Sequence, residues 1–256
     1  MNPLLGARDP LPVAVEREHG QSAFFLTCDH AGNRIPESLG NLGLDAPELQ
    51  RHIAWDIGAA GVSRHLARQL DATLVAQNYS RLVVDCNRPR DHEQLIPRSS
   101  EATAIPGNQM LVDAAREQRV DAIFRPYHAT ISTLLDQRAQ RRRATAFIAI
   151  HSFTPVYLGA DRPWHIGILY GRDRRLAVPI LEQLAADGGL CVGDNEPYRI
   201  DDKDQGIPVH GERRGLPCVA FEIRQDLIAS DKDQQVWASR LAGLLGHVLD
   251  VVSSAT

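Results

Sequence analysis

The sequence predicts an α/β protein whose mainly parallel sheet is covered by helices on both faces. Short apolar runs alternate along the chain with longer segments of helical periodicity, the order expected of strand–helix–strand units. Histidine, asparagine, arginine and glutamate residues lie at or near the ends of several of the apolar runs. Ligands bind at the carboxyl ends of parallel strands in such sheets, so we expect these side chains to meet at one edge.

Each predicted element follows from a local pattern. Short apolar runs predict strands over residues 23–28, 72–76, 82–86, 144–150, 166–170, 190–192 and 218–223. Longer periodic segments predict helices over 47–70, 111–143 (bent near Pro126), 174–186, and from an Asp231 cap to about 251. The segments 89–108 and 195–215 are polar, lack periodicity and predict long loops, which in a compact domain are usually functional or mobile.

Composition and charge narrow the class of protein. The chain has 256 residues, 43% of them hydrophobic and 23% charged, and a formal net charge of -4. The acidic total disfavours nucleic-acid binding, and the three arginines at 141–143 fit a solvated helix end. No apolar run is long enough to span a bilayer, and residues 1–20 lack the apolar core of a signal peptide. We expect one domain over 1–256, with 1–20 as a peripheral extension, in a soluble cytoplasmic monomer or homodimer without nucleic-acid or membrane partners.

Several motif-defined classes are disfavoured. The sequence contains no G-x-S-x-G, Walker A, G-x-G-x-x-G or H-E-x-x-H motif. The four cysteines are far apart and show no C-x-x-C spacing, so a cysteine zinc site or redox pair is not expected. We expect Cys28, Cys86, Cys191 and Cys218 to be reduced and buried.

Histidine and glutamate residues at predicted strand ends are candidates for metal chemistry. His30 follows the run 23–28 and precedes a glycine-containing turn, and His151 directly follows the run 144–150. Either could ligate zinc, and either could equally be a histidine bonded to backbone or packed in the core. Glu222 is more specific, because a glutamate at the end of an apolar strand is rarely buried without a partner or a chemical role.

His52 and Asp56 are spaced one helical turn apart within the predicted helix 47–70. They could be two metal ligands, a ligand with its supporting partner, or a surface pair. Arg88 follows the run 82–86 and offers a planar fork of donors that suits a substrate carboxylate. Alternatively, Arg88 pairs with Asp85 or Asp91.

Taken together, these segments resemble a known layout. Residues 85–88 (Asp-Cys-Asn-Arg) resemble the Asp-Leu-Asn-Arg segment of zinc carboxypeptidases and aspartoacylases. The histidine–serine pair at 151–152 resembles their third-ligand segment, and residues 221–224 resemble their catalytic glutamate strand. The order along the chain is the same.

The chain more closely resembles the N-formylglutamate amidohydrolase family. The resemblance extends over about residues 24–227 in short pieces that occur in the family's order. These pieces are residues 29–36, 55–58, 79–89, 127–128, 151–152 and 221–222.

The resemblance implies a three-layer α/β/α sandwich with a mainly parallel mixed sheet, like that of the zinc carboxypeptidases, and one zinc or other divalent ion per chain. It implies that His30 and His151 are ligands and Glu222 is the general base. The implied substrate-binding residues are Asn87 and Arg88 for a carboxylate, with Arg81, His128 and His210 as further candidates; the residues flanking His210 differ from the family's.

One departure from the carboxypeptidase pattern concerns the third ligand. Carboxypeptidases use His-x-x-Glu for their first two ligands, whereas Asn33 stands at the fourth position here. A neutral amide is a poor zinc ligand beside a carboxylate. We therefore expect Asp56 to complete the metal site with His30 and His151.

The expected function is zinc-dependent hydrolysis of an N-acyl amino acid, with N-formyl-L-glutamate as the first choice. The products would be formate and glutamate, as in histidine catabolism. The alternatives are a deacylase or carboxypeptidase of the same fold that acts on another N-acyl amino acid or small peptide, and a non-catalytic ligand-binding relative.

Overall fold

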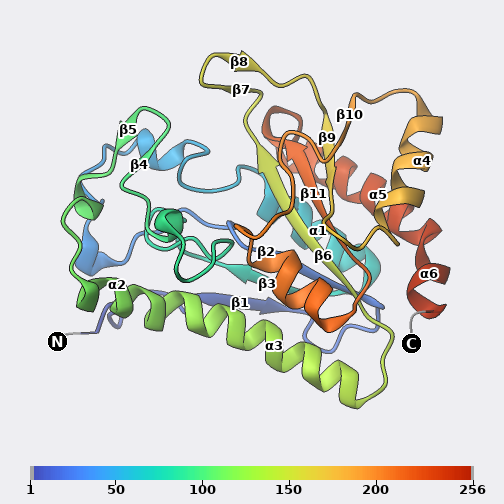
Figure 1. Cartoon of the computed structure of the whole chain (residues 1–256), viewed down its shortest axis with the longest axis horizontal. Helices are drawn as coiled ribbons and strands as arrows, with labels where there is room; N and C mark the ends of the chain where they lie inside the picture. Colours follow the sequence, from blue (N-terminus) through green and yellow to red (C-terminus); the bar gives the residue numbers. More distant parts are fainter. Residues whose placement is uncertain (1–2, 255–256) are drawn as a thin grey trace.

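The computed structural model describes residues 3–254, which form a seven-stranded sheet between two layers of helices and packed loops (Figure 1). In sheet order the strands are β1 (Val13–Glu16), β3 (Thr73–Gln77), β2 (Phe24–Cys28), β6 (Ala146–Phe153), β11 (Cys218–Arg224), β9 (Ile166–Leu169) and β10 (Val192–Asp194). The central strands β3, β2, β6 and β11 are parallel, whereas β1 and β9 run antiparallel to their inner neighbours. The predicted α/β/α sandwich with a mainly parallel mixed sheet is confirmed.

Each face of the sheet packs against its own layer. Helices α1 (Ala59–Leu70), α4 (Ala177–Asp187) and α5 (Asp231–His247) bury their apolar sides on one face. Helix α3 (Arg125–Gln140) covers the other face, together with the irregular segment that contains residues 79–96. Helices α2 (Asp113–Arg119) and α6 (Leu249–Ser254) complete the set. None of the helices in the described part of the chain combines the length and apolar character that a membrane crossing needs.

Strand alternation decides which face each site residue occupies. Successive side chains of a strand point to opposite faces. In β6, Ile148 and Ile150 pack with α1 and α5, whereas Phe147 and Ala149 pack on the α3 side. The same alternation puts His151 on the α3 side. In β11, Glu222 is the register partner of His151, so both side chains lie on this face near the strand ends.

The prediction of a strand over residues 82–86 is wrong. These residues form turns, although Leu82, Val83, Val84 and Cys86 are all fully buried. The free edge of β3 is already paired by β1, a strand that lies within the segment expected to be peripheral. With no open sheet edge beside it, the apolar run packs under the sheet against α3.

The predicted helix over 47–70 begins twelve residues later than expected, at Ala59. Residues 47–58 form short turns, so His52 and Asp56 do not share a helical face. His52 lies instead beside Glu101, with its Nε2 3.4 Å from the Glu101 carboxylate. Gly58 precedes the helix in the left-handed region, at φ 81°.

Other expectations need only small corrections. The helix predicted over 111–143 is present as α2, a π-helical turn (Val120–Phe124) and α3, with a proline in the first turn of α3. The cap of α5 is Ser230 rather than Asp231, since the Ser230 hydroxyl accepts the amide of Asp233. Cys191 is exposed, whereas the other cysteines are buried.

Candidate metal site

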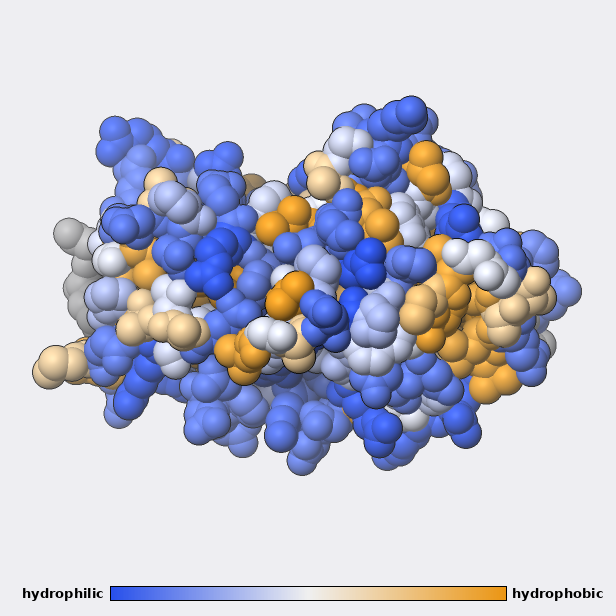
Figure 2. Space-filling view, turned by 90° about the horizontal axis from the view of Figure 1, so that it is seen from above, coloured by the Kyte–Doolittle hydropathy of each residue, from blue (hydrophilic) through white to orange (hydrophobic). Residues whose placement is uncertain are grey.

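A cavity of about 460 Å³ opens at the carboxyl ends of β2, β6 and β11, on the α3 side of the sheet. Its rim comes from the loops around the hairpins β4–β5 (Ser99–Ser100 and Thr103–Ala104) and β7–β8 (Val156–Tyr157 and Ala160–Asp161), and from residues 198–204. Figure 2 views the molecule from above, where mainly hydrophilic residues cover the middle of this face. The size is that of an ordinary small-molecule site, and the polar lining favours a polar ligand.

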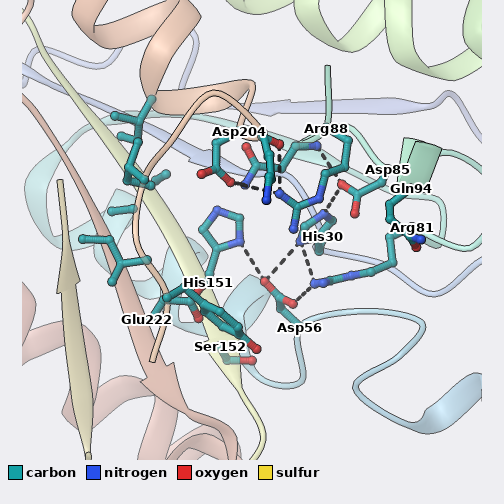
Figure 3. Close-up of a pocket in the computed structure, with 18 of the residues that line it drawn as sticks. His30, Asp56, Arg81, Asp85, Arg88, Gln94, His151, Ser152, Asp204 and Glu222 are labelled. Atoms are coloured by element: carbon teal, nitrogen blue, oxygen red, sulfur yellow. Dashed lines mark hydrogen bonds and ion pairs between the residues drawn. The ribbon is translucent and has the colours of Figure 1, made fainter. Parts of the chain in front are cut away.

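His30, Asp56 and His151 converge inside the cavity (Figure 3). All three are buried, and one ligand atom from each lies within 4.8 Å of the others. The Nδ1 atoms of His151 and His30 lie 2.9 and 3.4 Å from the same Asp56 oxygen, Oδ2. Two imidazoles and a carboxylate are a typical donor set for a catalytic divalent metal, and they leave a coordination position open. The structure thus brings together the residues that the sequence proposed as ligands.

An aspartate lies beside the outer nitrogen of each histidine, hydrogen-bonded to His30 and in a longer ionic contact with His151. Nε2 of His30 lies 2.7 Å from Oδ1 of Asp85, and Nε2 of His151 lies 3.4 Å from Oδ2 of Asp29. Asp29 also accepts the hydroxyl of Tyr127. A carboxylate on the outer nitrogen fixes the tautomer of a metal-binding histidine and raises its basicity. Sequence reasoning missed these aspartates, although each stands within a motif singled out for another residue.

Neighbouring aspartates favour a positive charge on both histidines. For His151, burial alone would lower the pKa, but Asp29 and Asp56 raise the pKa well above its usual value. For His30, burial and Arg81 lower the pKa, and Asp85 and Asp56 outweigh them. The carboxylates that favour a proton on these histidines would also favour a metal cation.

Arg81 lies at the centre of the donor set. Its Nη2 donates to the Asp56 carboxylate and to Nδ1 of His30, the latter at 2.6 Å. Burial opposes ionisation of Asp56, yet Arg81 and then His30 hold the pKa of that carboxyl well below its usual range. The single lone pair on His30 Nδ1 can accept the hydrogen bond from Arg81 or coordinate a metal, but it cannot do both. Metal binding therefore requires Arg81 to release His30.

Asn33 points away from this group. Its side-chain amide donates to the backbone oxygen of Leu49 at 2.8 Å. Asp56, in contrast, reaches the donor set because its backbone amide is bound to the His30 carbonyl at 3.0 Å. The geometry favours Asp56 over Asn33 as the third ligand.

Glycines allow the close backbone approaches that position the ligands. A Cβ on Gly58 would lie 2.3 Å from the carbonyl oxygen of Ile228, and a Cβ on Gly32 would lie 2.1 Å from that of Asn78. Both glycines therefore permit contacts that any other residue would block. Gly58 lies two residues after Asp56, and Gly32 two residues after His30.

Glu222 lies beside the donor set and is buried on the cavity wall (Figure 3). Within the described residues its Oε2 has no hydrogen-bond partner. Burial and then Asp56 raise the pKa of Glu222 to about 7, although His151 and Arg81 act in the opposite direction. A carboxylate whose pKa is near neutral can both take up and release a proton at physiological pH.

Arg88 also lines the cavity, where it is partly exposed. Its Nη1 donates to the carbonyl of Lys203 at 2.9 Å and lies 3.2 Å from Asp204. Asn87 lines the cavity as well, but its Oδ1 accepts the backbone amide of Gly206 at 2.9 Å. Arg88 thus keeps its Nε and Nη2 without a hydrogen bond among the described residues, while Asn87 is committed in part to holding the neighbouring loop.

His128 and His210 do not line the cavity, which is a correction to their expected role in substrate contact. They lie edge to edge behind it, joined by a hydrogen bond, with ring centroids 5.1 Å apart. Two cations missed by sequence reasoning, Arg199 and Lys203, do line the cavity. Among the residues that the structure describes, their side chains form no hydrogen bond or ion pair.

Comparison with known proteins identifies relatives. The sequence profile of the N-formylglutamate amidohydrolase family matches residues 22–229. N-formylglutamate deformylase of Pseudomonas putida is 27% identical over 128 residues, which cover 46% of this chain and 47% of that protein. The match therefore spans about half the length of that curated relative.

Two solved structures share the fold. Gene product Atu2144 from Agrobacterium tumefaciens is 39% identical, with a TM-score of 0.94 over 98% of this chain and 99% of that one. N-formylglutamate amidohydrolase from Ralstonia eutropha JMP134 is 18% identical, with a TM-score of 0.64 over 91% of this chain and 98% of that one. At that identity the second likeness supports the fold alone.

Proposed function

Because the chain belongs to the N-formylglutamate amidohydrolase family, we propose that it hydrolyses N-formyl-L-glutamate to formate and glutamate with one bound zinc ion. The observation that carries this proposal is the buried donor set His30, Asp56 and His151 beside Glu222 in one cavity. When bound there, zinc would polarise the amide carbonyl and make water more acidic at neutral pH.

Glu222 has the placement and the pKa of the general base. It faces the cavity next to His151, and its Oε2 has no partner among the described residues that would compete for a proton. In the proposed reaction Glu222 takes a proton from the attacking water and delivers it to the leaving nitrogen. Arg81 is the cation closest to the donor set and would stabilise the oxyanion that develops on the carbonyl.

The cations of the cavity suit a substrate with two carboxylates. Arg88 is partly exposed and can bind one carboxylate through its planar fork. Arg199 and Lys203, which have no side-chain partner among the described residues, can bind the second. N-formylglutamate carries two carboxylates at neutral pH.

A second candidate is a deacylase for larger acyl groups. Next to His151 and Glu222, the residues Ala149, Ala220 and Leu169 pair across three adjacent strands and line the cavity. These small and apolar side chains would suit an acyl group larger than formyl. Glu222 lines the cavity rather than the core, which supports an enzyme over a non-catalytic relative.

Metal content and product release test the proposal together. We expect close to one zinc per chain by mass spectrometry of protein purified without chelator, and its loss in His151→Ala. The control, His19→Ala, changes an exposed histidine outside the cavity and should keep its zinc. A wild-type protein that stays metal-free after zinc is added back would refute the metal site.

A substrate panel then decides the acyl group and the carboxylate requirement. Formate release from N-formylglutamate should exceed release from N-formylglutamine, which lacks the second carboxylate. Faster hydrolysis of N-acetylglutamate or longer acyl derivatives would favour the deacylase. Hydrolysis of none of these compounds by the zinc-loaded protein would reject both candidates.

A further inference from the structure

His128 and His210 form an edge-to-edge, hydrogen-bonded pair that the proposed chemistry does not use. His128 comes from α3 and His210 from a π-helical turn (Gly206–Gly211), and their rings are inclined by 13°. His210 is 1% exposed, and the rings of Phe124 and Tyr127 pack on His128 at 4.3 and 5.3 Å between centroids. Two polar rings in such a place cost desolvation energy that two phenyl rings would not. Their polarity therefore calls for a reason.

The hydrogen bonds of the pair run in one direction. Nε2 of His128 lies 2.9 Å from the carbonyl oxygen of Cys86, which can only accept, so this nitrogen carries a proton. Burial lowers the pKa of His128 to about 4, so the ring is neutral and its Nδ1 is an acceptor. His210 donates to that Nδ1 from Nε2 at 2.8 Å. The chain of donors therefore runs from His210 through His128 to the Cys86 carbonyl.

This chain ends next to the segment assigned to carboxylate binding. Cys86 directly precedes Asn87 and Arg88. The side chain of Asn87 accepts the amides of Gln205 and Gly206 at 3.2 and 2.9 Å, at the start of the turn that carries His210. Hydrogen bonds therefore link both ends of the segment 205–210 to residues 86–87. Asn87 holds the first end directly, and His128 connects His210 at the second end to the Cys86 carbonyl.

Arg88 depends on the same segment for its orientation. Its guanidinium donates to the carbonyl of Lys203 and to Asp204, just before the fastened stretch. We infer that His128 and His210 are positioning residues that hold Asn87 and Arg88 where they meet the substrate carboxylate. The inference rests on the proposed function, because it assumes that Arg88 binds a carboxylate.

The test removes the hydrogen bonds and keeps the ring. His128→Phe should raise KM for N-formylglutamate by about tenfold, the scale of one lost hydrogen bond to a well-placed group, with a smaller change in kcat. His128→Gln keeps a donor for Cys86 and an acceptor for His210, and should restore most of the wild-type KM. On N-propylformamide, which has no carboxylate, kcat/KM should be the same for wild type and variants.

Zinc content and thermal unfolding of each variant show that it is folded and loaded. His210→Phe probes the same chain of donors from its other end and replaces His128→Phe if that variant does not fold. His19→Phe introduces the same ring at an exposed histidine outside the cavity and should behave as wild type. An unchanged KM in both phenylalanine variants, or an equal loss of kcat/KM on both substrates, would overturn the inference.

Failure of the proposed function gives a different pattern. If the wild-type protein hydrolyses neither substrate, the proposed reaction is wrong, and titration calorimetry with L-glutamate decides the inference instead. The inference then requires weaker glutamate binding by His128→Phe than by wild type and His128→Gln. Equal affinities for all three would overturn it.

Discussion

Glu222 illustrates how a single side chain of the site acts against the stability of the fold. Burial raises its pKa from the usual 4.5 to about 7, so the ionised form that the proposed reaction needs is disfavoured in the folded protein. Its buried Oε2 has no hydrogen-bond partner in the described structure to offset that cost. Such conflicts between stability and activity are common at catalytic positions.

Replacement of Glu222 should separate catalysis from metal binding. We expect Glu222→Gln to lower kcat by about a hundredfold or more, the usual contribution of a general base, while zinc content stays at the wild-type level. The acidic limb of the wild-type kcat/KM profile should lie at or below about pH 7, because a bound cation favours the carboxylate. A variant with full activity would remove Glu222 from the mechanism.

Glu222→Gln should also be more stable than wild type in zinc-free buffer above neutral pH. The raised pKa means that the folded state binds more protons than the unfolded chain between pH 4.5 and about 7, so this group's stabilisation is lost as pH rises through that window. The glutamine of Glu222→Gln does not titrate. The free energy of unfolding of the variant should therefore exceed that of wild type by roughly 3 kcal/mol above pH 7. Urea unfolding at pH 4.5 and 8 measures the difference, and a constant difference would contradict the assignment.

Asp85 should matter through the histidine that it orients. We expect Asp85→Asn to weaken zinc binding by about ten- to a hundredfold, because His30 loses the carboxylate on its outer nitrogen. Competition with a chelator measures the affinity, and excess zinc should recover most of the activity. The matched control is Asp91→Asn, an exposed aspartate outside the cavity. Equal zinc affinities for both variants would show that Asp85 has no such role.

At the scale of elements, adjacent parallel strands carry the site. β2, β6 and β11 are neighbours in the sheet, so the residues after β2 and near the ends of β6 and β11 meet without long side chains. Asp56 does not come from a strand but lies on the turn before α1. That turn passes Ile228 so closely that only glycine fits at position 58.

Gly58→Ala should therefore damage the fold and the metal site together. The alanine Cβ would clash with the Ile228 carbonyl, and φ 81° is unfavourable for it. We expect a loss of about 1–3 kcal/mol in unfolding free energy, with lower zinc occupancy as Asp56 moves. In contrast, Gly243→Ala lies in helix α5, where the new Cβ meets nothing within 4 Å, and should stabilise by about 0.5–1 kcal/mol. Full zinc occupancy in Gly58→Ala would show that the turn tolerates the change.

At the scale of the whole molecule, the donor set joins three parts of the chain that are far apart in sequence. A metal bound to His30, Asp56 and His151 would link the loop after β2, the turn before α1 and strand β6. Such a link exists only in the folded state, so metal binding should stabilise the whole domain.

Removal of zinc should therefore lower the melting temperature. With free zinc at a hundred times its Kd, binding contributes about 2.7 kcal/mol, or roughly 5–10 °C for a chain of this size. Differential scanning calorimetry with and without chelator measures the shift, and His151→Ala should show none. A wild-type melting temperature that is independent of zinc would argue against a site on the folded protein.

The sequence by itself determined the fold class and the residues at the ends of three strands. Periodicity is a local property, and it located β2, β6 and β11 because each is a short apolar run. Since parallel strands end at one edge, His30, His151 and Glu222 could be grouped before the structure was seen. Asp56 could be proposed because Asn33 is a poor ligand.

Tertiary structure alone decided the contacts that sequence patterns do not encode. An apolar run such as 82–86 needs burial, but a strand also needs a free edge, and in the described sheet β1 and β2 pair both edges of β3. Asp29, Asp85 and the His128–His210 pair act through contacts between distant parts of the chain. Residue type and spacing report local preference, whereas burial, pairing and pKa depend on which distant groups the packing brings near.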